Sequence, residues 1–176
     1  MFIGVDCGLD SGAVGVISQD GKYIDCFMIE NDRPSKSKRN PDTELKKDTG
    51  RIDVKKLFDR ILAFESKDSF YVIEDVFIMP NQSATAQAKY MRAVGAIETA
   101  FKLSATDSNK IILVKPAQWK RDMSLSKEKE LSLDLARKLF PEAPLSRKKD
   151  HNLAEALLLA EWLRRAKAKN IFFNHL

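Results

Sequence analysis

The amino-acid sequence predicts one α/β domain in which a five-stranded mixed sheet carries helices on both faces. Two observations support this fold class. Three short apolar segments follow one another at the N-terminus, which predicts an antiparallel meander. From residue 52 onward, helical and strand-like patterns alternate, which is typical of parallel strands joined by helices. The length of 176 residues suits a single domain over residues 1–176 with a full hydrophobic core.

The meander is predicted from residues 2–8, 12–18 and 22–30. Its second turn contains Asp20-Gly21, a dipeptide that favours tight hairpins. Glycines in this region let the backbone turn tightly and leave one face of the hairpin open to close approach: Gly4, Gly8, Gly12 and Gly15.

A basic segment follows the meander. Residues 31–51 contain two prolines, seven Lys or Arg, four Asp or Glu, and Leu45 as the one large apolar residue. Such a composition cannot bury a hydrophobic face, so we expect a mobile basic loop.

The rest of the chain supplies the alternating helices and strands. Small residues on the longest helix would let a second helix, from this chain or from another subunit, pack closely against it: Ala84, Ala88 and Gly95. The expected elements are a helix from residue 52, a strand over 69–77, the long helix over 83–103, a strand over 110–114, a short turn or helix over 116–122, a helix capped by Ser126 and stopped at Pro141, and a final helix over roughly 150–168.

Composition limits the class of protein. Hydrophobic residues make up 44% of the chain, and no apolar run approaches the ~20 residues needed to cross a bilayer, so we expect no membrane association. No basic leader precedes the first strand, and the two cysteines lack partners at metal-ligand spacing, so we expect a protein of the reducing cytoplasm that is not secreted. The net charge of +5 favours a nucleic-acid partner, although many proteins of similar charge bind no polyanion.

Acidic residues in three separate segments indicate a metal-dependent site. Asp6 lies in the first strand, Glu74 in the fourth, and Asp150, His151 and Glu155 at the start of the last helix, where residues four apart share a face. Singly, each residue is better explained as a turn cap, an edge carboxylate or a surface histidine. Together, three carboxylates without thiolates suit Mg²⁺ or Mn²⁺, and two such ions about 4 Å apart would activate water for phosphodiester cleavage.

Basic residues near these acids are candidates for holding DNA phosphates. They are Lys36, Lys38 and Arg39 of the basic segment, and Arg147, Lys148 and Lys149 before the last helix. Runs of this kind are also common as solvated surface.

Three motifs carry a family resemblance. They are Gly4-Val5-Asp6-Cys7-Gly8 with the later Gly12 and Gly15, Ile73-Glu74-Asp75-Val76-Phe77, and residues 149–157, which read KDHNLAEAL. Over almost its whole length the chain resembles the RuvC-type Holliday junction resolvases of the RNase H-like superfamily, most closely the phage and organellar branch. The resemblance implies an RNase H-like fold.

The resemblance also implies roles for the acidic site. Asp6, Glu74 and Glu155 would be metal-binding carboxylates, and His151 would occupy the remaining place, where many relatives carry Asp. Because imidazole is a poor Mg²⁺ ligand, His151 would orient water or transfer a proton instead of binding the metal. Asp150 would be a further metal ligand or a helix cap.

Other segments acquire roles by the same likeness. Phe77 would enter the centre of the junction, and the helix over 83–103 would form a homodimer interface. The segment Lys115-Pro116-Ala117-Gln118-Trp119-Lys120 resembles a stretch of the phage and organellar relatives, which would place Lys120 near the scissile phosphate. Trp119 is equally explained as a core anchor.

The function that the resemblance implies is a homodimeric, Mg²⁺-dependent endonuclease that makes symmetric nicks in four-way DNA junctions. An alternative on the same fold is a nuclease for other branched DNA, such as flaps or replication forks. An actin-like phosphotransferase also begins with Asp and glycines, but it needs two related halves, and this chain has no internal repeat. We therefore expect no nucleotide cofactor. A DNA-binding module without activity is expected to lack a carboxylate, and all three are present.

Overall fold

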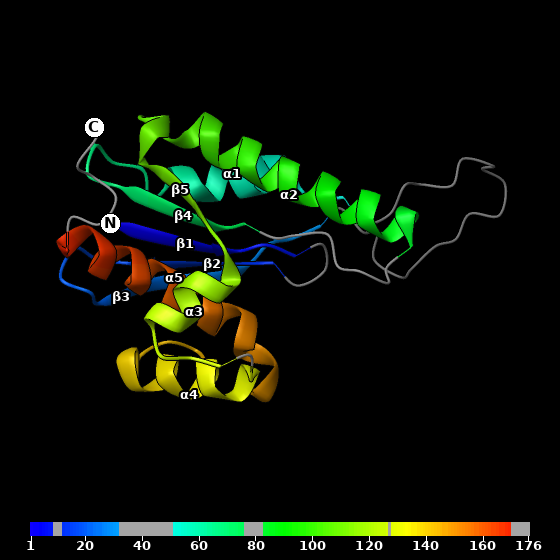
Figure 1. The fold of residues 1–176 in the computed structure, drawn as a ribbon. Helices are drawn as coiled ribbons and strands as arrows, with labels where there is room; N and C mark the ends of the chain where they lie inside the picture. The colour runs from blue at the N-terminus through cyan, green and yellow to red at the C-terminus, as the bar shows by residue number, and fades with distance from the viewer. Residues whose placement is uncertain (9–11, 32–50, 76–82, 127, 170–176) are drawn as a thin grey trace, which may run out of the picture.

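The computed structural model describes residues 1–8, 12–31, 51–75, 83–126 and 128–169. Their strands form one mixed sheet with the order β3-β2-β1-β4-β5 (Figure 1). Strand β1 pairs antiparallel with β2 and parallel with β4, while β2–β3 is antiparallel and β4–β5 parallel. The strands are β1 Phe2–Asp6, β2 Ala13–Ile17, β3 Tyr23–Met28, β4 Phe70–Glu74 and β5 Ile111–Val114.

Helices cover both faces of this sheet. In Figure 1, α1 and α2 lie over one face and α5 over the other, with α3 and α4 outside α5. This arrangement confirms the predicted fold class. The helices are α1 Val54–Leu62, α2 Ala84–Ser104, α3 Pro116–Asp122, α4 Lys129–Leu139 and α5 His151–Ala168, with single 3₁₀ turns at Ser108–Lys110 and Lys148–Asp150.

Several element boundaries differ from the sequence prediction. The strands predicted over 2–8 and 69–77 end earlier than expected, and the last residue of each is acidic: Asp6 and Glu74. Ser126 does not cap α4: its Oγ accepts from the Glu128 amide at 3.1 Å in a turn before the helix begins. Residues 32–50 of the expected basic loop lie outside the described residues.

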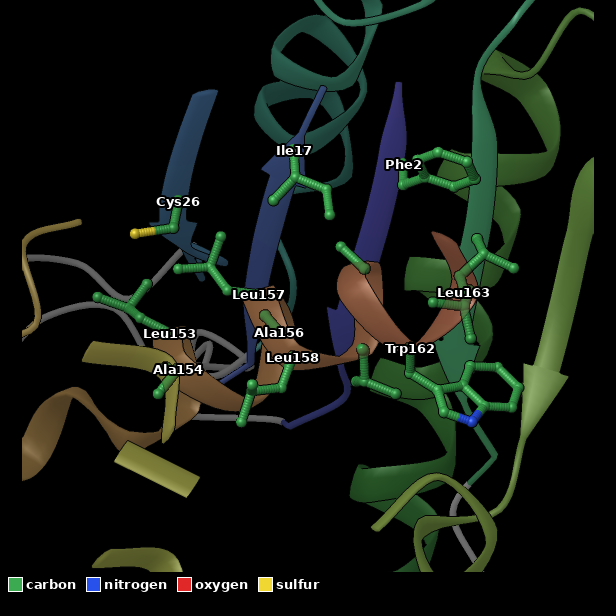
Figure 2. Packing of buried hydrophobic residues seen from close by; sticks show 14 of the residues in the cluster. Phe2, Ile17, Cys26, Leu153, Ala154, Ala156, Leu157, Leu158, Trp162 and Leu163 are labelled. Carbon is green, nitrogen blue, oxygen red and sulfur yellow. The ribbon is translucent and has the colours of Figure 1, made fainter. Parts of the chain in front are cut away.

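The sheet separates two hydrophobic cores because successive strand residues point to opposite faces. Ile3, Val5 and Tyr71 pack with α1 and α2. On the other face, residues of α5 such as Leu153, Ala156 and Leu157 pack against strands that carry Phe2, Ile17 and Cys26 (Figure 2). Both cysteines are free thiols and buried, as their apolar context predicts.

Helix α5 lies directly on the strand backbone at two paired glycines. Gly4 of β1 pairs with Gly15 of β2. A Cβ on Gly4 would come within 2.2 Å of the Ala156 carbonyl oxygen, and one on Gly15 within 2.5 Å of the Leu157 amide nitrogen. The open face that the glycines predict is therefore filled by a helix of this chain.

Helix α5 is buried on every side over most of its length. All residues from Asn152 to Leu163 are buried, because the sheet covers one side and α3 and α4 cover the other. A helix buried on every side cannot rotate about its axis without disturbing its packing against both neighbouring layers, so its packing register is fixed. In the described part of the chain, no helix has the length and apolar character to cross a membrane.

We expect Gly4→Ala to destabilise the fold strongly. The added methyl group meets the backbone of α5, which has no flexible end to move aside, so the loss should lie at or above the ~3 kcal/mol upper end of ordinary overpacking. Urea denaturation measures it. The matched control is Gly95→Ala on α2, where a Cβ meets nothing within 4 Å and helix propensity predicts a gain of about 0.5–1 kcal/mol. Equal stability of the two variants would contradict the close packing of α5.

Candidate functional site

Two strand ends bring Asp6 and Glu74 together. Gly4 faces α5, so Asp6, two residues later, faces the same way. The parallel register pairs Gly4 with Val72, which places Asp6 beside Glu74 at the next position on this face. Both carboxylates therefore lie at the carboxyl ends of adjacent central strands, on the side covered by α5.

The last helix adds a third carboxylate. Glu155 immediately precedes Ala156, the residue whose carbonyl oxygen lies over Gly4. Asp6, Glu74 and Glu155 are 9%, 7% and 6% exposed, respectively. Three distant segments thus supply three nearly buried carboxylates to one end of the sheet.

The carboxylates influence one another electrostatically. Burial raises the pKa of Asp6 well above its ordinary value, and the negative charges of Glu74 and Glu155 raise it further. Burial also raises the pKa of Glu74, with Glu155 adding to the effect, while a hydrogen bond from Trp119 opposes it. Among the described residues, no hydrogen bond or ion pair is assigned to the Asp6 carboxylate. Asp6 is therefore a buried acid whose negative charge lacks a close partner in this part of the chain.

Helix α3 provides partners for the other two carboxylates. It begins at Pro116 just after Val114, which pairs with Glu74 across the sheet. Trp119 Nε1 donates to Glu74 Oε1 at 2.8 Å, and Lys120 Nζ donates to Glu155 Oε1 at 2.7 Å. Adjacent residues of one short helix thus contact carboxylates from two other elements.

A serine of α4 also contacts the last carboxylate. Ser132 Oγ donates to Glu155 Oε1 at 3.0 Å. Both hydrogen bonds to Glu155 from described residues therefore use the same oxygen. The second oxygen, Oε2, accepts none from the described part of the chain.

His151 is held by two polar contacts at the start of α5. Its Nε2 lies 3.0 Å from Lys129 Nζ, and its Nδ1 lies 3.3 Å from the Lys148 carbonyl oxygen. A lysine ammonium can only donate, so Nε2 accepts and the ring proton resides on Nδ1, which donates to the carbonyl. The charge of Lys129 also lowers the pKa of Asp6.

Asp150 is engaged by the residue that begins its turn. Arg147 Nη2 donates to Asp150 Oδ1 at 2.7 Å, and the Arg147 backbone amide donates to Oδ2 at 2.8 Å. The hydrogen bond and positive charge of Arg147 lower the pKa of Asp150. These contacts close the 3₁₀ turn before α5 and occupy both carboxylate oxygens, and the Asp150 side chain accepts no hydrogen bond from the first turn of α5.

The remaining predicted contacts lie apart from the carboxylates or outside the described residues. Lys148 and Lys149 are exposed beside the start of α5, and Lys148 Nζ lies 3.3 Å from Glu130. The predicted DNA contacts that lie outside the described residues are Lys36, Lys38, Arg39 and Phe77.

Sequence reasoning missed three side chains of the site. Ser132 and Tyr90 carry no sequence signal, because only the fold brings them near; Tyr90 Oη, on α2, donates to the Cys7 carbonyl oxygen at 3.2 Å, just after Asp6. Trp119 had a signal in its position next to Lys120, but its contact with Glu74 could not be read from that position.

The donor chemistry of the site suits a hard divalent cation. Within the described residues, no group of three or more His, Cys, Asp or Glu side chains is arranged to hold a metal ion. The observation that fits a cation is the nearly buried Asp6 carboxylate, whose charge is opposed by two neighbouring carboxylates. All-oxygen donors are the ligands that Mg²⁺ and Mn²⁺ prefer, so Asp6, Glu74 and Glu155 are the residues that would hold such an ion.

Comparisons with known proteins identify the fold. No protein-family model matches the chain, and no curated protein matches it. The structure of T. thermophilus RuvC in complex with Holliday junction substrate is similar, with a TM-score of 0.59 and 17% sequence identity over 98% of each chain. A second Thermus thermophilus RuvC structure has a TM-score of 0.57 and 19% identity over 96% of this chain and 95% of that one. The chain therefore shares the RuvC fold over nearly its full length.

We expect Asp6→Asn to raise thermal stability in EDTA at neutral pH. An acid whose folded-state pKa is raised above its ordinary 3.8 weakens the fold as pH rises between those two values, so at pH 7 the ionised Asp6 is destabilising. Removing the charge should raise the melting temperature by several degrees, since about 1 kcal/mol corresponds to ~2–4 °C in a domain of this size.

Calorimetric melting of both proteins checks this result. Below the ordinary pKa of 3.8, where Asp6 is protonated in both the folded and the unfolded protein, the difference should disappear, and at pH 7 Mg²⁺ should stabilise the wild type more than Asp6→Asn. A variant less stable than wild type at pH 7 in EDTA would show that the Asp6 charge has a partner.

Proposed function

We propose that this protein is a Mg²⁺-dependent endonuclease that resolves four-way DNA junctions by symmetric nicks. The observation that carries the proposal is the convergence of Asp6, Glu74 and Glu155 at one end of the sheet on a RuvC-like fold. One of the similar structures is described as a complex with Holliday junction substrate, which supports this class of DNA as the partner.

In this proposal the three carboxylates are the metal-binding residues. Two Mg²⁺ ions, or Mn²⁺ in their place, would supply an activated water and stabilise the leaving oxygen of the phosphodiester. Asp6 would gain the positive partner that its burial calls for. Glu74 and Glu155 would bind through Oε2, since Oε1 of each already accepts from α3.

Lysines and the histidine would manage the other charges. Lys120 pairs with Glu155 and would contact the scissile phosphate when DNA is bound. Lys129 occupies His151 Nε2, so His151 can orient a water or accept its proton only when the Lys129 ammonium moves away, for example to a phosphate. This exchange would couple DNA binding to the availability of the imidazole.

Substrate contacts would extend beyond the carboxylates. The exposed Lys148 and Lys149 would hold phosphates near the cut, together with Arg147 to the extent that its pair with Asp150 allows. The proposed contacts outside the described residues are Lys36, Lys38 and Arg39 for phosphates and Phe77 for the junction centre.

A homodimer would place two sites on a two-fold symmetric substrate. The proposed interface is α2, whose first half, residues 84–92, has no fully buried residue. Ala84 and Ala88 are exposed in this half and Met91 is 42% exposed, so another helix could approach closely. Two copies related by a two-fold axis would present their carboxylates to equivalent strands of a junction.

The proposal extends to the branch of the family and the place of action. The segment 115–120, which resembles a stretch of the phage and organellar relatives, favours that branch. The site of action would be the cytoplasm, or the host cytoplasm for a phage-encoded protein. Asp150 would close the turn that leads into α5, or act as a metal ligand if Arg147 releases it for DNA.

We expect Asp6→Asn and Glu74→Gln to bind a four-way junction nearly as well as wild type but to lose cleavage by at least ~100-fold. Substituting a residue that only orients a metal ligand already lowers metal affinity or activity about 10–100-fold. Asp6→Asn and Glu74→Gln alter the proposed ligands themselves, so their effect should be at least as large. A labelled synthetic junction, incubated with Mg²⁺, Mn²⁺ or EDTA, measures cleavage, and gel shift measures binding.

The control for these variants is Asp59→Asn, which removes an exposed carboxylate of α1 that pairs with Lys55. Cleavage by either site variant at a near wild-type rate would refute the assignment of the site. Flap and fork substrates in the same panel separate junction resolution from a broader activity on branched DNA.

We expect the Lys148→Ala/Lys149→Ala variant to bind the junction more weakly and with less salt dependence. Each lysine–phosphate contact contributes about 0.7–0.9 to the slope of log affinity against log salt, so the slope should fall by about 1–2. Fluorescence anisotropy over a salt series measures it. Lys55→Ala, on the opposite helical layer, should keep the wild-type slope, and an unchanged slope in the double variant would remove these lysines from the DNA interface.

A further inference from the structure

Trp119 has a polar contact that packing alone does not require. The side chain is fully buried on α3, and its Nε1 donates to Glu74 Oε1 at 2.8 Å. Among the described residues, no other hydrogen bond is assigned to the Glu74 carboxylate. A phenylalanine would fill most of the same space without a donor, so the indole N–H is the feature of Trp119 that serves Glu74.

The hydrogen bond fixes one oxygen of Glu74 and leaves the other available. The carboxylate is nearly buried at the end of β4, where water can do little to orient it. A buried N–H donor restricts its rotation, and a donor bound to the carboxylate stabilises the ionised form. The arrangement has the form of an outer-sphere contact, which orients a metal ligand without touching the metal.

The same helix connects this contact to a second carboxylate. Lys120 Nζ lies 2.7 Å from Glu155 Oε1 and 5.2 Å from the centre of the Trp119 ring. Helix α3 therefore positions Glu74 and Glu155 through two neighbouring residues.

We propose that Trp119 is a positioning residue that holds Glu74 through Oε1 and so presents Oε2 to a divalent cation. This inference rests on the proposed function, because it takes Glu74 as a metal-binding carboxylate. Trp119 does not contact the metal or the substrate in this role. Its loss should weaken metal binding and leave DNA binding unchanged.

The chain contains a matched control for this test. Trp162 on α5 is also buried, and its Nε1 donates at 3.1 Å to Asp122 Oδ2 at the last residue of α3, so it tethers the same helix without contacting Glu74. Trp119→Phe and Trp162→Phe each remove one buried indole that is hydrogen-bonded to an acid. A general loss of packing, or a shift of α3 as a whole, should affect both variants, whereas loss of the hydrogen bond to Glu74 should affect only the first.

The experiment measures Mn²⁺ binding by calorimetry, and the Mg²⁺ dependence of junction cleavage, in the full-length wild type and both variants. Trp119→Phe should raise the Mn²⁺ dissociation constant about 10–100-fold and raise the half-saturating Mg²⁺ concentration in parallel. Trp162→Phe should stay within about threefold of wild type, and both variants should bind the junction like wild type in EDTA. Equal metal affinities for the two variants would overturn the inference.

A spectroscopic measurement keeps the test valid if Trp119→Phe fails to fold. In Trp162→Phe, Trp119 is the sole indole, and a paramagnetic Mn²⁺ ion bound at Glu74 should quench its emission, whereas Mg²⁺ should not. Adding Glu74→Gln should abolish the quenching. Quenching that persists in this double variant would show that Mn²⁺ binds elsewhere.

The outcomes separate the inference from the proposed function. A wild type that binds Mn²⁺ in a Trp119-dependent way but cuts no branched DNA would refute the function and support the positioning role. A wild type that cuts junctions while both tryptophan variants behave alike would refute the positioning role alone. Absence of Mn²⁺ binding by the wild type would overturn both.

Discussion

The close approach of α5 to the glycine pair of β1 and β2 determines where the site lies. Gly4 and Gly15 have no side chains, so the backbone at Ala156 comes within van der Waals distance of the strands. A strand advances about 3.3 Å per residue, so Asp6 lies about 7 Å beyond Gly4 toward the end of the sheet. Glu155 precedes Ala156 on the helix and lies toward the same end. A helix held farther away would leave the two carboxylates separated by side chains, without the electrostatic effect that they have on each other.

Holding these three acids close together lowers the stability of the folded protein. Desolvation and like charge both raise the pKa of Asp6, so ionisation at neutral pH weakens the fold. The chain limits this penalty with its own cations: Lys120 pairs with Glu155, and the charge of Lys129 favours the ionised Asp6. Like-charged carboxylates that burial holds close together, with raised pKa values, are common at functional sites. The acidic end of the sheet is therefore difficult to explain by stability.

The fold and the acidic residues could be predicted from sequence because their signals are local. Strand patterns and turn residues indicated the meander, and a charge within an apolar strand marked Asp6 and Glu74. The role of the glycines was not predictable, because nothing in the meander reveals that the close approach is made by a helix more than 130 residues away. The contacts of Trp119 and Ser132 were hidden for the same reason. Each depends on where α3 and α4 pack against α5, and that is decided by the whole tertiary structure.

The position of helix α3 determines the contacts of two of the three carboxylates. Strand β5 ends at Val114, which pairs with Glu74, and α3 begins two residues later at Pro116. The position of β5 therefore determines where α3 begins. Trp119 and Lys120 point to different carboxylates because adjacent helical residues are rotated by about 100°. A shift of α3 would thus alter the contacts of Glu74 and Glu155 together, whereas a side-chain change at either residue alters one. Trp119 donates to Oε1 of Glu74, and Lys120 donates to Oε1 of Glu155. Helix α3 thus holds one oxygen of each carboxylate and leaves Oε2 of each without a hydrogen bond from α3. In the proposed function, these contacts would orient the two carboxylates before a cation arrives.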